Sequence, residues 1–284
     1  MLTDTKSFTT EEIDYIHHGD RALKRRLYKP VGAGPFPVVV DLHGGAWNNG
    51  DLNGCKGQDE VMADTGLAVA ALDFRQAADR YPNSSVDINY AIRWLKVHAG
   101  DLGLDAERVG ISGQSSGGHL AMLAGMRPND ARYASIAVEG GGSVDASVRC
   151  VGMLWPVMNP LARYRHALRS RDETPPAEWV GDIPESHDRY WVTDENMTEG
   201  NPTMALESGE AVETPPATWI QSLPDPVHNF TDPESGLGLT EPERFAHAYR
   251  EAGGDIEVTY IEKADRTTRG AYDPLAAFFK KHLA

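Results

Sequence analysis

The feature that most constrains this chain is the pentapeptide G-Q-S-S-G at residues 113–117. The residues before it, 108–112, have the pattern of a short buried strand, and residues 118–124 form an apolar run that predicts a helix. Glycine has no Cβ, so Gly113 and Gly117 permit the close backbone contacts of a sharp strand-to-helix turn. The sequence therefore predicts that Ser115 lies at the tip of a tight turn, where its hydroxyl can act as a nucleophile.

Strand and helix patterns alternate along the rest of the chain. A hairpin with its turn at Gly19-Asp20 is predicted over residues 13–28. Apolar runs predict further strands at 37–42, 67–73, 148–155, 218–223 and 256–261. Helices are predicted by apolar residues at helical spacing over 58–65, 86–95, 241–252 and 273–283. This alternation predicts an α/β fold, with a mostly parallel central sheet and helices on both faces.

One long segment, residues 156–216, interrupts this alternation. It has no clear strand, a predicted helix over 161–168, and several prolines, tryptophans and methionines. An excursion of this length is usually functional or disordered, and its apolar content argues against disorder. We expect it to form a lid over Ser115, inserted into a core made of residues 1–155 and 217–284. Packing decoration at the edge of the sheet is the alternative interpretation.

Charge and composition exclude several classes of function. The net charge of −15 disfavours partners such as nucleic acids and anionic membranes, and the 284 residues suffice for one α/β domain with insertions. We see no secretory leader, no bilayer-spanning stretch and no disulfide framework in the two cysteines, Cys55 and Cys150, so a cytoplasmic protein is expected. No metal-ligand spacing is evident, so neither a metal nor a cofactor is expected. The sequence leaves a homodimer open.

A second glycine-rich loop, H-G-G-A-W at residues 43–47, follows the predicted strand 37–42. Acyl transfer places negative charge on the former carbonyl oxygen of the substrate, and preorganised backbone N–H groups stabilise that charge. The small residues of this loop would let the substrate oxygen approach closely. The expected donors of this oxyanion hole are the N–H groups of Gly45, Ala46 and Ser116.

Together these motifs resemble the α/β-hydrolase superfamily, in its esterase and lipase group with an H-G-G loop. The chain is similar to bacterial carboxylesterases, and more distantly to kynurenine formamidases. The matching pieces are H-G-G-A-W at 43–47, D-F-R at 73–75, D-x-x-x-A-I-R-W-L at 87–95 and G-Q-S-S-G-G-H-L at 113–120. The resemblance is close over residues 36–125 and holds only in outline in the last third of the chain.

The resemblance implies a serine hydrolase that cleaves an ester, lactone or amide through an acyl-Ser115 intermediate. It also implies that the acid follows the predicted strand 218–223, where Asp225 stands in a D-P-V sequence. The substrate is a small molecule, and four large apolar side chains could line its pocket or belong to the core: Trp47, Trp155, Met158 and Trp191.

The catalytic histidine departs from the family pattern. The family places it after the last strand, but residues 260–268 contain no histidine, and Asp265 stands in its place. His228, three residues after Asp225, lies in a loop that can reach Ser115 from the carboxyl ends of the strands. Our hypothesis is a rearranged triad, with Ser115 as nucleophile, His228 as general base, and Asp225 or Asp265 fixing its tautomer.

Two further interpretations accompany this hypothesis. His119 follows Ser115 by one helical turn, and we expect it to hydrogen-bond beneath the turn rather than to act as a base. The alternative function is a ligand-binding homologue with a broken triad. Plant gibberellin receptors resemble esterases of this group and lack the catalytic histidine, and a receptor of this kind would bind a carbonyl or carboxylate group without turnover.

Overall fold

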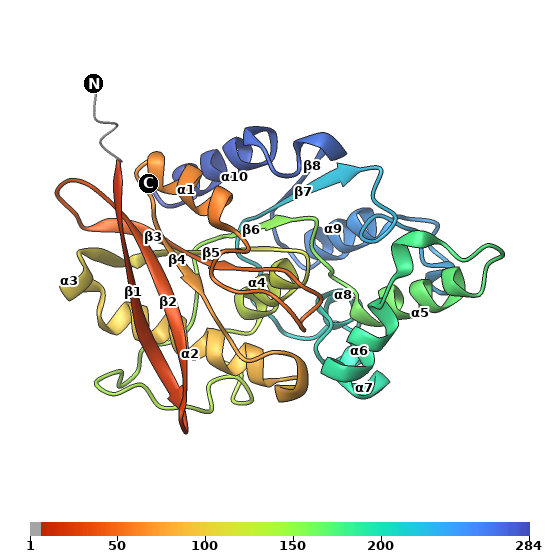
Figure 1. Ribbon diagram of the computed structural model, residues 1–284, viewed down its shortest axis with the longest axis horizontal. Helices are drawn as coiled ribbons and strands as arrows, with labels where there is room; N and C mark the ends of the chain where they lie inside the picture. Colours follow the sequence, from red (N-terminus) through yellow and green to blue (C-terminus); the bar gives the residue numbers. More distant parts are fainter. Residues whose placement is uncertain (1–6) are drawn as a thin grey trace.

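One mixed sheet forms the centre of the protein in the computed structural model, which describes residues 7–284 (Figure 1). Within those residues it has eight strands in the order β1-β2-β4-β3-β5-β6-β7-β8. Their bounds are β1 (Phe8–His18), β2 (Arg21–Pro30), β3 (Phe36–Leu42), β4 (Ala68–Leu72), β5 (Leu104–Gln114), β6 (Val151–Leu154), β7 (Ala217–Leu223) and β8 (Ile256–Glu262). The pairs β1–β2 and β2–β4 are antiparallel, and the pairs that run from β4 through β3, β5, β6 and β7 to β8 are all parallel. The predicted mostly parallel sheet is confirmed.

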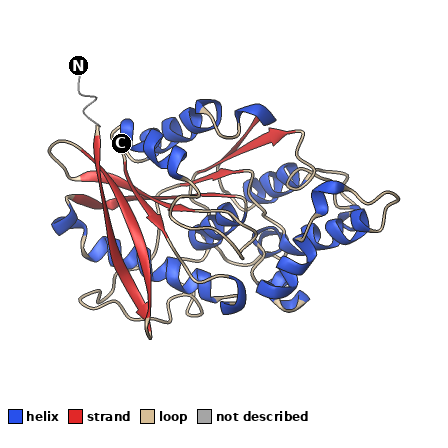
Figure 2. Cartoon of the chain, viewed as in Figure 1, coloured by secondary structure: helices blue, strands red, loops and turns tan. Residues whose placement is uncertain are grey.

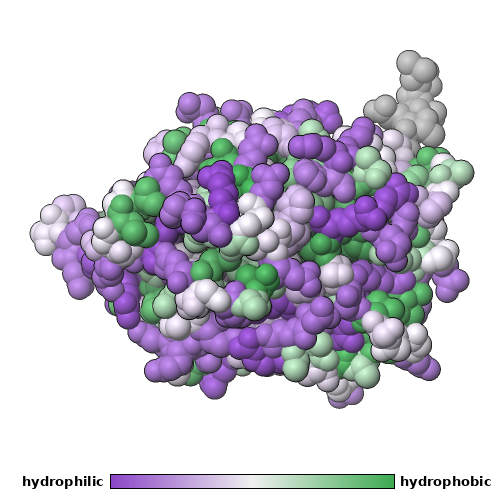
Figure 3. All heavy atoms as spheres, turned by 180° about the vertical axis from the view of Figure 1, so that it is seen from behind, coloured by the Kyte–Doolittle hydropathy of each residue, from purple (hydrophilic) through white to green (hydrophobic). Residues whose placement is uncertain are grey.

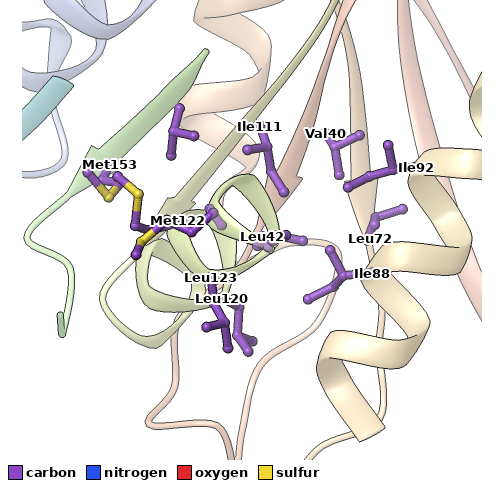
Figure 4. Packing of buried hydrophobic residues seen from close by; sticks show 14 of the residues in the cluster. Val40, Leu42, Leu72, Ile88, Ile92, Ile111, Leu120, Met122, Leu123 and Met153 are labelled. Carbon is purple, nitrogen blue, oxygen red and sulfur yellow. The ribbon is translucent and has the colours of Figure 1, made fainter. Parts of the chain in front are cut away.

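Helices cover both faces of this sheet, as Figure 2 shows. One apolar cluster joins alternate residues of the central strands to α1 (Lys56–Asp64) and α10 (Arg269–His282). The opposite cluster joins the other residues to α2 (Asn83–Val97), α4 (Ser116–Met126) and α9 (Glu241–Glu251). Figure 4 shows part of this second cluster, where Val40 and Ile111 of the sheet lie between α2 and α4. Because both faces are covered, β4 is a continuous apolar run and β3 is apolar except at Asp41, and both are buried in all but the first two residues of β3.

The segment from 156 to 216 contains helices joined by irregular loops and no strand. It contains α5 (Pro160–Arg171), α6 (Ile183–Trp191), α7 (Asp194–Glu199) and α8 (Pro202–Glu207), which Figure 1 draws in green at one side of the sheet. The predicted helix 161–168 is confirmed within α5, and the three helices after it were not predicted. The side chain of Asn48, after β3, donates to the carbonyl oxygen of Ser186 at 2.7 Å. The insertion therefore rests on the loops at the carboxyl ends of the strands.

Most predicted boundaries hold to within a few residues. The last helix begins at Arg269 rather than at 273, because the Thr268 hydroxyl accepts a hydrogen bond from the N–H of Gly270 and caps it. The short α3 (Ala99–Leu102) precedes β5. No helix within residues 7–284 has the length and apolarity needed to cross a membrane. The face seen in Figure 3 is mostly hydrophilic, with apolar residues scattered over it.

Candidate active site

Ser115 lies at the junction of β5 and α4, in a conformation that L-residues rarely adopt. Its φ is 51° and its ψ is −116°, a strained combination of the kind that costs about 1–3 kcal/mol. Two glycines make the turn possible. A Cβ on Gly113 would lie 2.4 Å from the backbone of Gly117, and a Cβ on Gly117 would lie 2.2 Å from the carbonyl oxygen of Leu42. The junction is thus the sharp serine turn that the sequence predicts.

His228 approaches Ser115 from the loop after β7. Its Nε2 lies 2.9 Å from Ser115 Oγ, and its Nδ1 lies 3.0 and 2.9 Å from the two carboxylate oxygens of Asp225. An ionised carboxylate only accepts hydrogen bonds, so Nδ1 carries the ring proton and donates it to Asp225. The lone pair of Nε2 is then free to accept the hydroxyl proton of Ser115. The structure brings together the serine, the histidine and one of the two acids of the hypothesis.

Asp225 is buried and held in place by its own loop. Its carboxylate accepts hydrogen bonds from Gln221 Nε2 at 3.1 Å, from the N–H of Val227 at 3.2 Å and from Ser222 Oγ at 3.4 Å. Burial alone would raise the pKa of Asp225, but the hydrogen bond and charge of His228, then Arg266, lower this pKa to about 2. The carboxylate is therefore ionised at every pH at which the protein would work.

The pKa of His228 lies below its usual range. Burial is the largest cause, and the hydrogen bond to Asp225 opposes it. The charges of Arg163 and Arg266 lower the pKa further. The imidazole is therefore neutral near pH 7, which is the protonation state that a general base requires.

The structure does not place Asp265 on the imidazole. Asp265 ends a short 3-10 helix after β8, and its carboxylate accepts from the Thr268 hydroxyl at 3.4 Å, where it supports the start of α10. The neighbouring residue, Arg266, faces the site instead. Its Nη1 lies 3.6 Å from the Asp225 carboxylate, and its guanidinium lies 4.2 Å from the ring centre of Trp155. Of the two candidate acids, Asp225 and Asp265, Asp225 is the one that contacts His228. Arg266 is a site residue that the sequence did not predict.

The H-G-G loop packs directly against the serine turn. A Cβ on Gly44 would lie 3.4 Å from the Cβ of Ser115. Gly45, Ala46 and Trp47 have φ values of 115°, 52° and 61°, so strain is concentrated in this loop. Ser116 is the first residue of α4, and its N–H has no acceptor within the helix. The predicted oxyanion donors thus lie in two segments that meet at Ser115.

His119 has a structural environment, as expected. Its Nδ1 accepts a hydrogen bond from the indole N–H of Trp47 at 3.1 Å, and its Nε2 donates to the carbonyl oxygen of Gly200 at 2.7 Å. Burial lowers the pKa of His119 to about 3, so the ring stays neutral. Both ring nitrogens are engaged in joining the H-G-G loop to the insertion.

The four predicted pocket residues are all buried. Trp47, Trp155, Met158 and Trp191 expose between 0 and 4% of their surface. Trp47 and Trp191 pack edge to face with ring centres 5.2 Å apart, which accounts for their burial as core residues. Their contact with a substrate stays a prediction.

Comparison with known proteins decides the family. The family model described as BD-FAE matches residues 27–194, more than half of the chain. The chain belongs to the BD-FAE family. The match includes the H-G-G loop, the serine turn and α5, and it ends before Asp225 and His228. The acid and base of this BD-FAE chain therefore lie outside the part that the family model matches.

Curated relatives of this BD-FAE chain carry esterase names. The chain is similar to the probable carboxylic ester hydrolase LipM of Mycobacterium tuberculosis, with 30% identity over 52% of this chain and 39% of that protein. It is also similar to the esterase LipC of the same organism, with 34% identity over 44% of this chain and 32% of that protein. The matches span less than half the length of these relatives.

Solved structures share the fold of the whole BD-FAE chain. The match to the hyperthermophilic esterase of the archaeon Pyrobaculum calidifontis covers 96% of this chain and 85% of that protein, with a TM-score of 0.72 and 21% identity. The match to carboxyl esterase 2 of the fungus Tuber melanosporum covers 99% of this chain and 89% of that protein, with a TM-score of 0.73 and 19% identity. The chain thus has the α/β-hydrolase fold.

Proposed function

We propose that this protein is a serine hydrolase that cleaves esters through an acyl-Ser115 intermediate. One observation carries the proposal, namely the continuous chain of contacts from Ser115 Oγ through His228 to the Asp225 carboxylate, each of about hydrogen-bond length. The names of the curated relatives, a carboxylic ester hydrolase and an esterase, support the reaction class. Lactones and amides undergo the same chemistry and belong to the proposed substrate range.

In the proposed mechanism, the Ser115 hydroxyl attacks the carbonyl carbon of the ester while His228 Nε2 takes its proton. The imidazolium that forms is stabilised by the ionised Asp225, which holds Nδ1–H. His228 then returns the proton to the departing alcohol. A water molecule hydrolyses the acyl-enzyme by the same route in reverse, because His228 is again neutral and can accept its proton.

The N–H groups of Gly45, Ala46 and Ser116 would stabilise the oxyanion of both tetrahedral intermediates. Each such donor typically contributes about 2.7–4 kcal/mol to catalysis. The strain of the H-G-G loop and of Ser115 supports this role, because backbone strain tends to persist where preorganised geometry is needed. We propose that residues 156–216 cap this site, since His119 and Asn48 tie the insertion to its floor.

The alternative, a binding protein with a broken triad, depends on the absence of a base. The loop after β8 has no histidine, but His228 is within reach of Ser115 and of an ionised acid. This arrangement favours turnover over simple binding.

The test is hydrolysis of 4-nitrophenyl acetate by the wild type and by Ser115→Ala and His228→Ala. We expect each variant to lose at least about 10³-fold in kcat, because members of a triad act as a unit. His247→Ala is the matched control, since His247 is exposed on α9 and should leave kcat unchanged. Fluorophosphonate should label the wild type and not Ser115→Ala. Full activity of His228→Ala, or failure of the wild type to react with either reagent, would contradict the proposal.

A further inference from the structure

Arg163 on α5 is buried without a counter-ion at hydrogen-bond distance. It exposes 2% of its surface, and its Nε and Nη2 have no hydrogen-bond partner among the described residues. Burying an ionised group without such a partner costs several kcal/mol. Burial lowers the pKa of Arg163 to about 9 although the charge of Asp225 opposes this shift, and the group is still charged at pH 7. A bound anion would remove the penalty.

The position of Arg163 on α5 brings it to the triad. The segment leading into α5 contacts the serine turn, because the N–H of Val157 donates to the carbonyl oxygen of Ser115 at 3.3 Å. One turn after Arg163, on the same helix face, His166 Nε2 donates to the carbonyl oxygen of Pro226 at 3.1 Å, next to Asp225. Arg163 thus follows the segment that contacts the nucleophile and precedes the residue that contacts the acid loop, and its charge acts on both Asp225 and His228.

One aromatic contact orients the guanidinium. It lies 5.1 Å from the ring centre of Trp47, the last residue of the H-G-G-A-W loop. The indole N–H of Trp191, whose ring also packs on Trp47, is a second buried donor without a partner in the described part of the chain. His187 Nε2, in a ring that also packs on Trp47, is an unpaired acceptor within residues 7–284, because Nδ1 donates to Ile183 O. Buried polar groups are nearly always satisfied, and here the unpaired donors outnumber the unpaired acceptor, which indicates a missing acceptor.

The charges around the triad agree with an anionic ligand. Asp225 is ionised, and it already accepts the hydrogen bond of His228 Nδ1–H and faces the charge of Arg266. His119 and His187 have lowered pKa values and stay neutral, chiefly because they are buried. The charge of Arg163 therefore leaves the site with a local positive surplus, in a chain whose net charge is −15.

We propose that Arg163 binds a carboxylate of the substrate, so that the preferred substrates are esters that also carry a free carboxylate, such as half-esters of dicarboxylic acids. This inference rests on the proposed esterase function of the same site. The planar fork of a guanidinium matches the two oxygens of a carboxylate, and such charge-assisted pairs are among the strongest hydrogen bonds in proteins.

The protein contains a matched control for this arginine. Arg25 exposes 0% of its surface, also has no hydrogen-bond partner for its guanidinium in residues 7–284, and also lies 5.1 Å from a tryptophan ring centre, that of Trp94. It stands on β2, in the antiparallel pair at the edge of the sheet, rather than beside the triad. Arg25→Met therefore reproduces the loss of a buried, stacked arginine without touching the proposed site.

The experiment compares kcat/KM for two ester pairs, with the charge on the acyl part or on the leaving group. The pairs are mono-4-nitrophenyl glutarate against 4-nitrophenyl pentanoate, and 4-acetoxybenzoate against 4-acetoxybenzamide. In at least one pair, we expect Arg163→Met to reduce the ratio of charged to neutral ester by about 10- to 100-fold. Arg163→Lys should lose less, and Arg25→Met should keep the wild-type ratio.

Equal losses for charged and neutral esters in Arg163→Met would overturn the inference, since they would mean that Arg163 only supports Trp47. An unchanged ratio in both pairs would overturn it too.

Binding separates this inference from the esterase proposal. In Ser115→Ala, monomethyl glutarate should raise the Tm and methyl pentanoate should not, and adding Arg163→Met should abolish that shift. A shift without any ester turnover by the wild type would contradict the esterase proposal alone, and no shift for the half-ester would contradict the carboxylate site.

Discussion

At the scale of single residues, the site depends on two groups that share one loop. Asp225 and His228 are three residues apart, and Asp225 Oδ2 lies 2.9 Å from His228 Nδ1. Burial pulls their pKa values in opposite directions, upward for the acid and downward for the base. The hydrogen bond between them opposes burial in both cases. The result is an ionised acid beside a neutral base, which is the combination that proton transfer from Ser115 requires.

The first prediction concerns pH. A protonated His228 cannot accept the Ser115 proton, so kcat/KM for a neutral ester should fall as the pH drops through the pKa of His228. Because burial lowers that pKa, the midpoint of the acid limb should lie below about 6.5, the value for an unperturbed histidine. A pH–rate profile with 4-nitrophenyl butyrate measures it.

The control for this profile is Asp265→Asn. Asp265 contacts Thr268 and not the imidazole, so its removal should leave the midpoint of the acid limb where it is. An acid limb above about 6.5 in the wild type would mean that Asp225 outweighs burial. A midpoint that moves in Asp265→Asn would restore Asp265 as a partner of the base.

At the scale of elements, the serine turn is where three segments meet with no spare volume. The end of β3 packs so closely on the first turn of α4 that a Cβ on Gly117 would lie 2.2 Å from Leu42 O and 2.5 Å from His43 O. The H-G-G loop then continues from His43 past Ser115. The position of the expected oxyanion donors is therefore set by backbone contact between β3 and α4.

Replacing Gly117 tests this dependence. Gly117→Ala should reduce the free energy of unfolding by at least about 2 kcal/mol, because overpacking a rigid contact typically costs 1–3 kcal/mol and this contact is with backbone. Chemical denaturation followed by circular dichroism measures the change. Gly100→Ala is the control, since a Cβ there meets nothing within 4 Å, and it should be neutral or slightly stabilising. Equal stability of the two variants would show that β3 and α4 can separate freely.

The elements differ in how well the sequence predicts them. Buried parallel strands such as β3 were recognisable because they are continuous apolar runs between turn signals. The helices α6 and α8 were missed because Pro184 and Pro202 look like helix breakers, whereas each stands in the first turn, where a missing N–H costs nothing. Strand 148–155 was predicted too long, because Trp155, although its N–H still donates to Ile220 O, has a φ of 37° that ends the extended conformation.

The candidate site divides in the same way. Ser115 and the H-G-G loop were predictable because local motifs carry them, and His228 was within reach because its loop leaves the carboxyl end of β7. Arg266 and Arg163 were not predictable. Their roles depend on contacts between segments far apart in the chain, such as Arg266 with Asp225 and Arg163 with Trp47. No local pattern distinguishes them from other arginines.

At the scale of the whole molecule, the insertion is fastened to the core by arginines. Arg127, just after α4, binds the Glu199 and Glu210 carboxylates at 3.1 and 2.6 Å. Arg244 on α9 binds Glu207 at 2.6 Å. Pairs like these hold geometry more than they add stability. The end of the insertion around α8 should therefore unfold together with the core.

The reactivity of the two cysteine thiols measures whether the core unfolds as one cooperative unit. Cys55 and Cys150 are buried, and burial raises both thiol pKa values, that of Cys150 to about 12. Because thiolate is the reactive form, the native protein should react with DTNB only through unfolding, and both thiols should react in concentrated guanidinium. Absorbance of the released thionitrobenzoate at about pH 8 measures both states. Rapid reaction of one thiol in the native protein would reveal a local opening next to β3 or β6.

The closeness of Asp225 and His228 has a further consequence for how such a site can change over time. A relay whose two partners sit on separate loops is altered whenever either loop drifts, whereas here both travel on one short segment after β7. The stretch from Gln221 to His228 contains the base, the acid and three donors that hold the acid. The spacing between acid and base is therefore fixed within one short segment. The loop after β8 contributes Arg266 to the same site, so only its histidine position has been given up.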